Sequence, residues 1–301
     1  MQTVYKALKW AQNKIQASIS VGAAPCVCPQ HKTTRIGSDL YVYSQYKIDA
    51  EFLLSAVLNV KRTNLPLIRQ EKLTPTQLKQ FKKYIARRVK REPVSYILGS
   101  CEFMGLDFKV NQSVLIPRPE TELLVEEVLK IASKFNKKSV LDLCCGSGAI
   151  AVSLSKIGAF KDIVASDINK DALKIAKENS LKNQSENIEF IESDMFEDLR
   201  GKSFDIIVSN PPYISKEEFE NLKPELHFEP HIALFADDGG FFFYKKIAQE
   251  ARKYLNTDGY LLIELNSNLS CKIKEIFEKN GFKDIEILKD YAGLDRILKC
   301  R

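Results

Sequence analysis

Residues 204–213 read Phe204-Asp205-Ile206-Ile207-Val208-Ser209-Asn210-Pro211-Pro212-Tyr213, an apolar run followed by two prolines. The apolar part predicts a buried strand, and the prolines end it because each removes a backbone N–H and fixes φ. Asn210 then stands at the carboxyl end of a strand, where open α/β sheets bind their ligands. The alternative is a plain Pro-Pro turn with a capping asparagine and no ligand.

The chemistry of this loop suits a planar amino group. The Asn210 side chain offers one acceptor and two donors, and the proline carbonyls beside it lack competing N–H groups. Tyr213 adds a flat ring for stacking. We therefore predict that Asn210, Pro211 and Tyr213 carry catalysis, and that Pro212 joins these three in binding the substrate.

From Ser139 onward, short apolar strands alternate with helical segments. This alternation predicts an α/β fold with a mostly parallel, doubly wound sheet and helices on both faces. A short turn at Ala292-Gly293 joins two final strands, which we expect to form an antiparallel edge hairpin. The predicted strands are 140–143, 163–166, 188–191, 204–209, 260–265, 284–288 and 296–299, and the predicted helices are 148–156, 171–181, 241–255 and 269–280.

The part before this sheet divides into two segments. Residues 1–92 predict a helical domain, with helices at 3–18 and, after Thr74-Pro75, at 76–90. Four glycines and prolines within 19–45 predict a long loop. Two short alternating runs around Gly105 predict a hairpin within a linker of residues 93–116. A helix at 120–132 then opens a catalytic domain of residues 117–301.

Composition narrows the function classes. The 301 residues include 45 Lys and Arg against 39 Asp and Glu, a charge of +6 that is too small for a dedicated nucleic-acid binder. Seven scattered cysteines imply no disulfide framework and favour a reducing, cytoplasmic compartment. No apolar run is long enough to predict a membrane span. The first 38 residues lack Asp and Glu, as targeting segments do, but we favour an ordinary first helix.

Two other clusters were weighed as sites. Cys26, Cys28 and His31 lie close in sequence, but no second ligand pair at matching spacing accompanies them, so we predict no metal site. The helix at 76–90 and the residues after it carry a dense basic run. This run predicts either a solvated face or a docking surface for an acidic or RNA-bound partner. Its members are Lys79, Lys82, Lys83, Arg87, Arg88, Lys90 and Arg91.

A glycine-rich loop, Asp142-Leu143-Cys144-Cys145-Gly146-Ser147-Gly148-Ala149-Ile150-Ala151, follows the first strand of the predicted sheet. Its glycines let the backbone approach a ligand at the head of the next helix. Asp167 ends the second strand and suits both hydroxyls of a ribose. Asp194 ends the third strand, where it can accept a hydrogen bond from an adenine amino group while Met195 packs on the base.

The glycine loop also fits a dinucleotide fingerprint and therefore a nicotinamide enzyme. Two features favour S-adenosylmethionine instead. Asp142 precedes the loop, where a carboxylate would meet an amino-acid end rather than a pyrophosphate, and no second nucleotide-binding half follows. We predict that S-adenosylmethionine is bound by Asp142, Cys144, Cys145, Gly146, Ser147, Gly148, Asp167, Asp194, Met195 and Asn210.

Residues 47–300 resemble the N5-glutamine methyltransferases of peptide-chain release factors. The resemblance rests on Arg91–Gly99, Leu115–Glu122, Asp142–Ala151 and Ser209–Ile214. It implies a seven-stranded, Rossmann-like class I methyltransferase sheet and a small helical N-terminal domain that helps grip the release factor. It also implies methylation of the glutamine in that factor's Gly-Gly-Gln loop. The chain departs from the family pattern at Cys144, where a glycine is common, and at Met195, where an aromatic residue is common.

Carried over by position, the resemblance places the cofactor on the loop from Cys144 to Gly148, on Asp167, and on Met195 or Asp194. It places the glutamine amide on the loop from Asn210 to Tyr213. We add Phe103 to the substrate-binding residues, and we expect a monomer with no stable nucleic-acid complex and no membrane partner. The open alternatives are a ribosomal-protein glutamine methyltransferase, an adenine-N6 nucleic-acid methyltransferase, a nicotinamide dehydrogenase and a non-catalytic scaffold.

Overall fold

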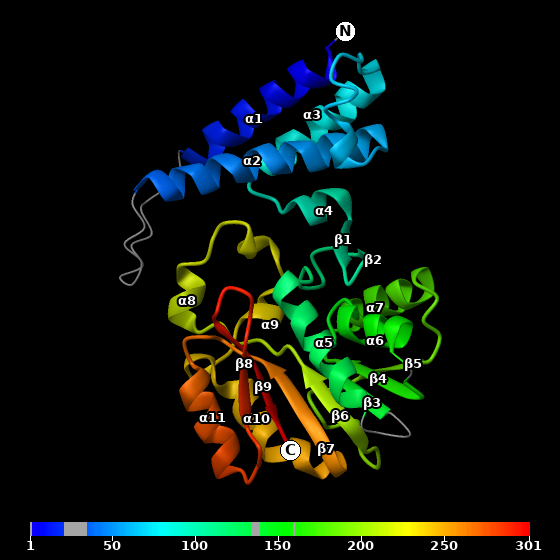
Figure 1. The fold of residues 1–301 in the computed structure, drawn as a ribbon, viewed down its shortest axis with the longest axis vertical. Coiled ribbons are helices and arrows are strands. Elements are labelled where there is room, and N and C mark those ends of the chain that lie inside the picture. Colours follow the sequence, from blue (N-terminus) through cyan, green and yellow to red (C-terminus); the bar gives the residue numbers. More distant parts are fainter. Residues whose placement is uncertain (1, 21–34, 134–138, 159) are drawn as a thin grey trace. The chain divides into compact units, whose positions relative to one another are not determined.

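The computed structural model describes residues 2–20, 35–133, 139–158 and 160–301 (Figure 1). The chain divides into two compact units, Met1–Leu98 and Gly99–Arg301. No helix within the described ranges is long and apolar enough to cross a membrane. The same residues hold no cluster of three or more metal-ligating side chains, and Cys26, Cys28 and His31 lie outside them.

The first unit is helical, as predicted. It contains α1 (Val4–Ser20), α2 (Arg35–Leu58), a short 3-10 turn η1 (Arg62–Asn64), α3 (Pro75–Val89) and α4 (Val94–Leu98). Helix α3 begins where expected because Thr74 and Gln77 cap it reciprocally, each side chain accepting a hydrogen bond from the other's backbone N–H. Side chains of α1, α2 and α3 meet in one apolar cluster.

The loop predicted over 19–45 is wrong from Arg35 onward, because α2 begins there. Residues 35–58 contain no proline, and the single Gly37 lies close to the helix start. One glycine costs a helix only about 1 kcal/mol, so it did not justify extending the loop. The part of the predicted loop within 21–34 lies outside the described residues.

The basic run on α3 is partly internal. Arg88 Nε lies 2.7 Å from Asp49 Oδ2, and both side chains are only 5% exposed. Arg87 forms a two-point contact with Glu92, at 2.5 and 2.8 Å. Lys79, Lys82, Lys83 and Lys90 are exposed. Arg87 and Arg88 therefore help to hold the helical unit together, and the four exposed lysines form a basic face.

The second unit is built on a seven-stranded sheet with the order β5-β4-β3-β6-β7-β9-β8. The first five strands in this order are parallel, and β9 runs antiparallel between β7 and the edge strand β8. This arrangement confirms the predicted sheet and closing hairpin. The strands are β3 (Ser139–Leu143), β4 (Asp162–Asp167), β5 (Ile188–Glu192), β6 (Phe204–Ser209), β7 (Leu255–Glu264), β8 (Glu286–Lys289) and β9 (Asp295–Cys300).

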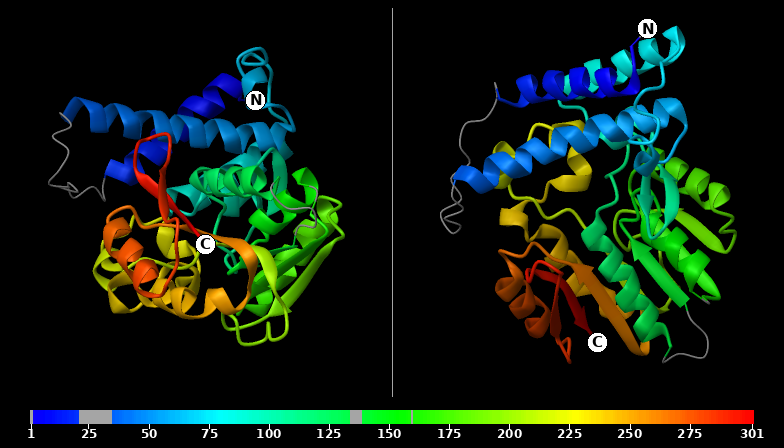
Figure 2. Two further views of the ribbon diagram at one scale, coloured as in Figure 1. Left: turned by 60° about the horizontal axis from the view of Figure 1, so that its bottom comes forward. Right: turned by 45° about the horizontal axis from the view of Figure 1, so that its top comes forward.

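Helices cover both faces of the sheet because successive strand residues point to opposite sides and both sides are apolar (Figures 1 and 2). Val140 packs with α5 (Pro119–Ala132), α6 (Ala149–Ile157) and α7 (Lys170–Lys182). Leu141 and Leu143 pack with α10 (Phe242–Glu250) and α11 (Ser270–Lys279). Two short helices, α8 (Lys216–Glu220) and α9 (His231–Leu234), were not predicted and follow β6.

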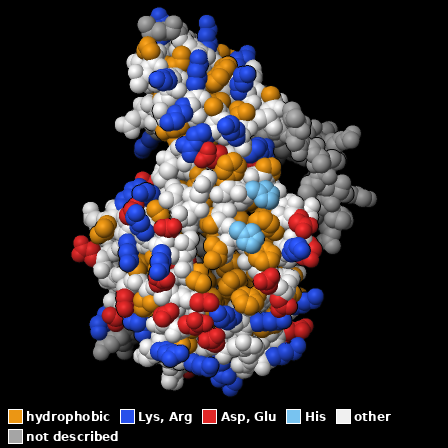
Figure 3. All heavy atoms as spheres, turned by 180° about the vertical axis from the view of Figure 1, so that it is seen from behind, with side chains coloured by type: hydrophobic (Ala, Val, Ile, Leu, Met, Phe, Trp, Pro, Cys, Tyr) orange, Lys and Arg blue, Asp and Glu red, His pale blue; other side chains and the backbone are white. Residues whose placement is uncertain are grey.

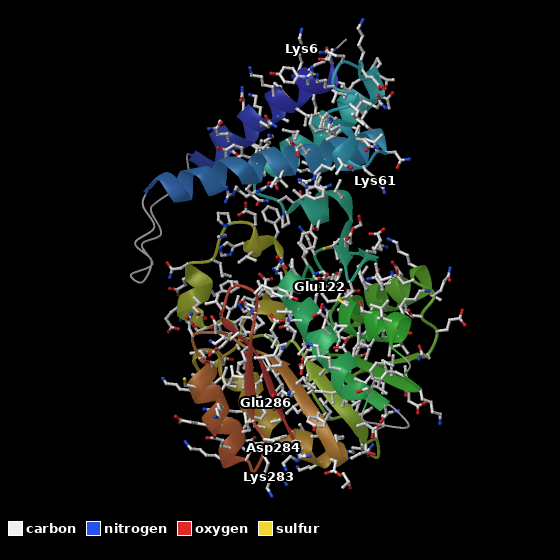
Figure 4. The ribbon with its side chains drawn as sticks, in the orientation of Figure 1. Lys6, Lys61, Glu122, Lys283, Asp284 and Glu286 are labelled. Carbon is white, nitrogen blue, oxygen red and sulfur yellow. The ribbon has the colours of Figure 1, made fainter. Side chains whose placement is uncertain are left out.

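The predicted hairpin consists of β1 (Ser100–Phe103) and β2 (Leu106–Lys109). Its turn residues Met104 and Gly105 both have positive φ. The hairpin belongs to the second unit, whereas α4, which lies in the same predicted linker, belongs to the first. Glu122, labelled near the start of α5 in Figure 4, accepts a hydrogen bond of 2.7 Å from the Met104 backbone N–H. This bond fixes the turn on the sheet unit.

Candidate active site

A cavity of about 230 Å³ lies at the carboxyl ends of β3, β4, β5 and β6. Its floor contains the loop from Cys144 to Ser147, together with Asp167, Asp194, Met195 and Asn210. The remaining wall comes from residues 113–121 and from side chains of α9 and α10. The structure therefore brings together, in one cavity, most residues predicted from four separate strand ends.

The glycine loop is shaped by positive φ angles. Gly148 has a φ of 77°, and a Cβ atom there would lie 3.0 Å from the Ala176 Cβ, so α7 packs close to the loop. Cys144 has a φ of 64°, in the left-handed region that disfavours side chains. Its Sγ lies 3.8 Å from the Met195 Sδ, and Met195 also has a positive φ. The two departures from the family pattern thus touch each other at the cavity wall.

Asp167 is presented to the cavity by backbone groups. Its Oδ2 accepts a hydrogen bond of 2.8 Å from the Gly146 N–H, and its Oδ1 accepts one of 2.9 Å from the Asn169 N–H. Burial raises the pKa of Asp167, and these N–H groups oppose that effect. A carboxylate has about four lone-pair sites, so two remain for a pair of vicinal hydroxyls. The residue therefore fits the ribose of S-adenosylmethionine.

Asp142 does not line the cavity, contrary to the predicted contact with the cofactor's amino-acid end. It is completely buried, because the alternation along β3 turns it toward α6. Its Oδ2 accepts a hydrogen bond of 2.9 Å from the Ala151 N–H, in the first turn of that helix. Its Oδ1 has no hydrogen-bond partner among the described residues. Burial raises the pKa of Asp142 to about 8.

We expect Asp142→Asn to change the pH dependence of stability. A carboxyl whose pKa is raised on folding contributes stability below its unfolded value, and this contribution is lost as pH rises through the folded value. For Asp142 the loss spans about pH 4 to about pH 8. The free energy of unfolding, measured with urea across this pH range, should therefore fall more steeply with rising pH for the wild type than for Asp142→Asn. Equal slopes in the two proteins would contradict the assignment, and the exposed Asp162→Asn is the control.

Asn210 is held by a short chain of polar side chains. Its Nδ2 lies 3.3 Å from the Thr121 Oγ1, and Thr121 Oγ1 lies 2.6 Å from the Glu264 Oε2. The Tyr213 hydroxyl lies 3.4 Å from the other oxygen, Glu264 Oε1. Thr121 and Glu264 were not predicted as site residues. An acid within the apolar run Leu261-Leu262-Ile263-Glu264-Leu265 was the signal that could have identified Glu264.

Three predicted residues lie elsewhere than expected. The Tyr213 ring packs with the apolar cluster on the α10 side and does not line the cavity. Pro211 is buried and is likewise not part of the cavity wall, whereas Pro212 is. Phe103 is 1% exposed and packs edge-on against Phe108, so the structure places it in the core rather than at a substrate surface.

The loop after β6 is fixed on both of its sides. A Cβ atom at Gly240, which has a φ of 90°, would lie 2.6 Å from the Tyr213 carbonyl oxygen, so only glycine permits this close approach. Glu229, whose side chain is 2% exposed, accepts hydrogen bonds from the Arg118 guanidinium at 2.5 Å and from the Ile116 N–H at 3.0 Å. These contacts join residues 116–118 to the segment that follows Asn210.

The rim of the cavity is apolar. Ile232 is 49% exposed and Phe242 is 44% exposed, and both line the cavity. Figure 3 shows apolar side chains gathered beside the two described histidines, His227 and His231. At the floor, Asp194 pairs with Lys246 at 2.9 Å while its side chain remains 45% exposed.

Two solved structures share the fold of this chain. A methyltransferase from Pyrococcus furiosus matches with a TM-score of 0.52, 19% identity, and coverage of 73% of this chain and 98% of that one. The hMettl16 catalytic domain matches with a TM-score of 0.56 and 16% identity, and the match covers 72% of this chain and 81% of that domain's chain. The family described as Methyltransferase small domain matches residues 119–227. Fold, cavity and family match together define an S-adenosylmethionine-dependent methyltransferase.

Sequence relatives specify the class further. The family described as PrmC N-terminal domain matches residues 41–99. A release factor glutamine methyltransferase of Clostridium acetobutylicum is 40% identical over 84% of this chain and 90% of its own length. A release factor glutamine methyltransferase of Flavobacterium psychrophilum is 40% identical over 86% of this chain and 93% of its own length. The chain belongs to the release factor glutamine methyltransferase family.

Proposed function

We propose that this protein transfers the methyl group of S-adenosylmethionine to the side-chain amide nitrogen of the glutamine in the Gly-Gly-Gln motif of peptide chain release factors, and so modulates translation termination. The observation that carries the proposal is the position of Asn210, which lines the same cavity as the glycine loop and Asp167. The names of the relatives supply the substrate class.

The residues of the cavity floor fit the cofactor. Asp167 would hold the ribose hydroxyls, and the backbone of the loop from Cys144 to Ser147 would lie against the amino-acid end. Asp194 retains exposed oxygen for an adenine amino group, and the buried Met195 would support the base. When bound, S-adenosylmethionine supplies an electrophilic methyl group on a sulfonium centre.

The loop from Asn210 to Tyr213 would prepare the substrate amide. An amide nitrogen is a poor nucleophile because its lone pair is delocalised into the carbonyl. The Oδ1 of Asn210, which lines the cavity, would accept one of the two N–H bonds, so that the nitrogen is oriented and the positive charge that develops on it is stabilised. Proton loss follows transfer, when the N–H has become acidic, and therefore needs no strong base. Tyr213 would act by supporting the loop.

The rim and floor favour a protein substrate over a nucleic acid. The exposed Ile232 and Phe242 offer apolar contact to a peptide loop. Among the described residues that line the cavity, the charged ones are Arg118, Asp167 and Asp194, and Arg118 is already paired with Glu229. Asp194 is likewise paired with Lys246, so the floor carries no excess of positive charge that would attract a phosphate backbone. We therefore propose that the protein binds release factors without a stable nucleic-acid complex. As expected from the sequence, we also propose that it is a cytoplasmic monomer.

Transfer of labelled methyl groups tests the proposal. The protein is incubated with labelled S-adenosylmethionine and, separately, with a release factor, the same factor with its motif glutamine replaced by alanine, ribosomal proteins, and duplex DNA. We expect label only in the unaltered release factor, and mass spectrometry should place one methyl group on the motif glutamine. Label in DNA or in ribosomal proteins, with none in the release factor, would overturn it.

A further inference from the structure

The side-chain amide of Asn210 can be arranged in two ways, and they differ in chemistry. With Oδ1 toward the cavity, it accepts hydrogen bonds from a substrate amide; with Nδ2 toward the cavity, it would oppose the substrate's own N–H groups. The two arrangements have nearly the same shape, so hydrogen-bond partners must select one. The only side chain bonded to the Asn210 amide among the described residues is Thr121, at 3.3 Å from Nδ2.

The direction of the Thr121 hydroxyl is in turn set by its hydrogen bond to Glu264. The oxygens are 2.6 Å apart, the separation typical of a hydroxyl that donates to a carboxylate. An ionised carboxylate only accepts, and a hydroxyl has one proton, so the Thr121 hydroxyl gives that proton to Glu264. Its remaining lone pairs can only accept. The Asn210 amide must therefore turn Nδ2 toward Thr121, which leaves Oδ1 facing the cavity.

The polar contacts of Glu264 favour this direction, whereas its burial opposes it. The Glu264 residue is 1% exposed and Thr121 is 5% exposed, so both are largely shielded from bulk solvent. Arg296 on β9 attracts the negative charge of Glu264, and the Tyr213 hydroxyl donates to its other oxygen. Burial and the nearby Glu120 raise the pKa of Glu264, whereas Thr121, Arg296 and Tyr213 oppose them.

We propose that Thr121 and Glu264 are positioning residues that fix which face of the Asn210 amide meets the substrate. The proposal rests on the proposed function, because it assigns a task to one residue in the wall of the same cavity, Thr121, and to one behind that wall, Glu264. Glu264 sets the direction of the Thr121 hydroxyl, and Thr121 sets the direction of the Asn210 amide. Neither touches the reacting atoms.

Two substitutions test the two steps. Thr121→Val keeps the shape and removes the hydroxyl, and Glu264→Gln keeps the shape but adds donors that allow the chain of bonds to reverse. We expect each to lower kcat for release-factor methylation about tenfold or more, since misorientation of a reacting group has effects of this size. The KM for S-adenosylmethionine should stay within about twofold of the wild type, because neither residue faces the predicted ribose or adenine contacts.

A conservative substitution and a double variant distinguish a positioning role of Thr121 and Glu264 from a role in packing alone. Thr121→Ser restores the hydroxyl and should recover kcat to within about threefold of the wild type. The double variant Thr121→Val with Glu264→Gln should be no slower than Thr121→Val alone, because the two act in series. Ser139→Ala is the matched control, since it removes a hydroxyl that lies 3.1 Å from the Asp205 carboxylate at the other end of the sheet.

The outcomes are distinct. If Thr121→Val keeps wild-type kcat, or Thr121→Ser is as slow as Thr121→Val, the positioning role is overturned. If the Ser139→Ala control loses kcat equally, the effect is general instability and the role is also overturned. Failure of the proposed function would look different, because the wild-type protein would then methylate no release factor at all.

Discussion

Asn210→Ala should lower the turnover of release-factor methylation about a hundredfold to a thousandfold, the range found when one charge-stabilising hydrogen-bond group is removed from an active site. The substitution removes the Oδ1 acceptor that would orient the glutamine nitrogen. It leaves the glycine loop, Asp167 and Asp194 in place, so cofactor affinity should change little. Labelled methyl transfer measures the first quantity, and calorimetric titration with S-adenosylmethionine measures the second.

A control separates this effect from a general loss of fold. Asn280→Ala removes an asparagine whose Nδ2 donates to the Ile276 carbonyl at the end of α11, away from the cavity. It should keep wild-type turnover. Asn210→Asp keeps the shape but replaces the amide donors by a second acceptor, which clashes with the direction of the Thr121 hydroxyl; it should also be slow. Normal turnover of Asn210→Ala would rule out its catalytic role.

Asp167→Ala should weaken the binding of S-adenosylmethionine about a hundredfold or more. Two hydrogen bonds to a charged acceptor would be lost, each worth roughly 1.5–3 kcal/mol in favourable geometry. The substitution also frees the Gly146 and Asn169 N–H groups that shape the loop. Calorimetric titration with S-adenosylmethionine and with its demethylated product should show the same loss, because both carry the same ribose.

The control for Asp167→Ala is a substitution at the opposite end of the same strand. Asp162 begins β4, is 66% exposed, and faces Lys161 at 3.9 Å. Asp162→Ala should keep cofactor affinity within about twofold of the wild type, since exposed ion pairs contribute little. Equal affinities for Asp167→Ala and the wild type would exclude the ribose role.

The sequence predicted the sheet well because its strands are short apolar runs that end in recognisable residues. Phe204–Ser209 has the predicted bounds, since two prolines end it. The short helices α8 and α9 were missed because five and four residues carry too little periodicity. The start of α2 was missed because Gly37 follows Gly22, Pro25 and Pro29, and the four residues together predicted one continuous loop.

The candidate site was predictable where a residue type and a strand end coincided, as for Asp167 and Asn210. The side of the sheet to which each strand side chain points was harder to predict. Asp142 was expected at the cofactor, but the pleat of β3 turns its side chain under α6. Tyr213 was expected at the substrate because its ring suits stacking, yet the ring packs partly buried into the apolar cluster on the α10 side. Phe103 was also expected at the substrate, yet it is buried in the core. Glu264 was missed because its partner Thr121 is 143 positions away.

The position of β9 between β7 and β8 has a consequence for biosynthesis. β8 leaves the ribosome before β9, which is the only strand that it pairs with among the residues that the structure describes. Until residues 295–300 emerge and insert, β7 and β8 each present an unsatisfied backbone edge to other nascent chains. Chaperone demand should therefore peak during that short interval of synthesis.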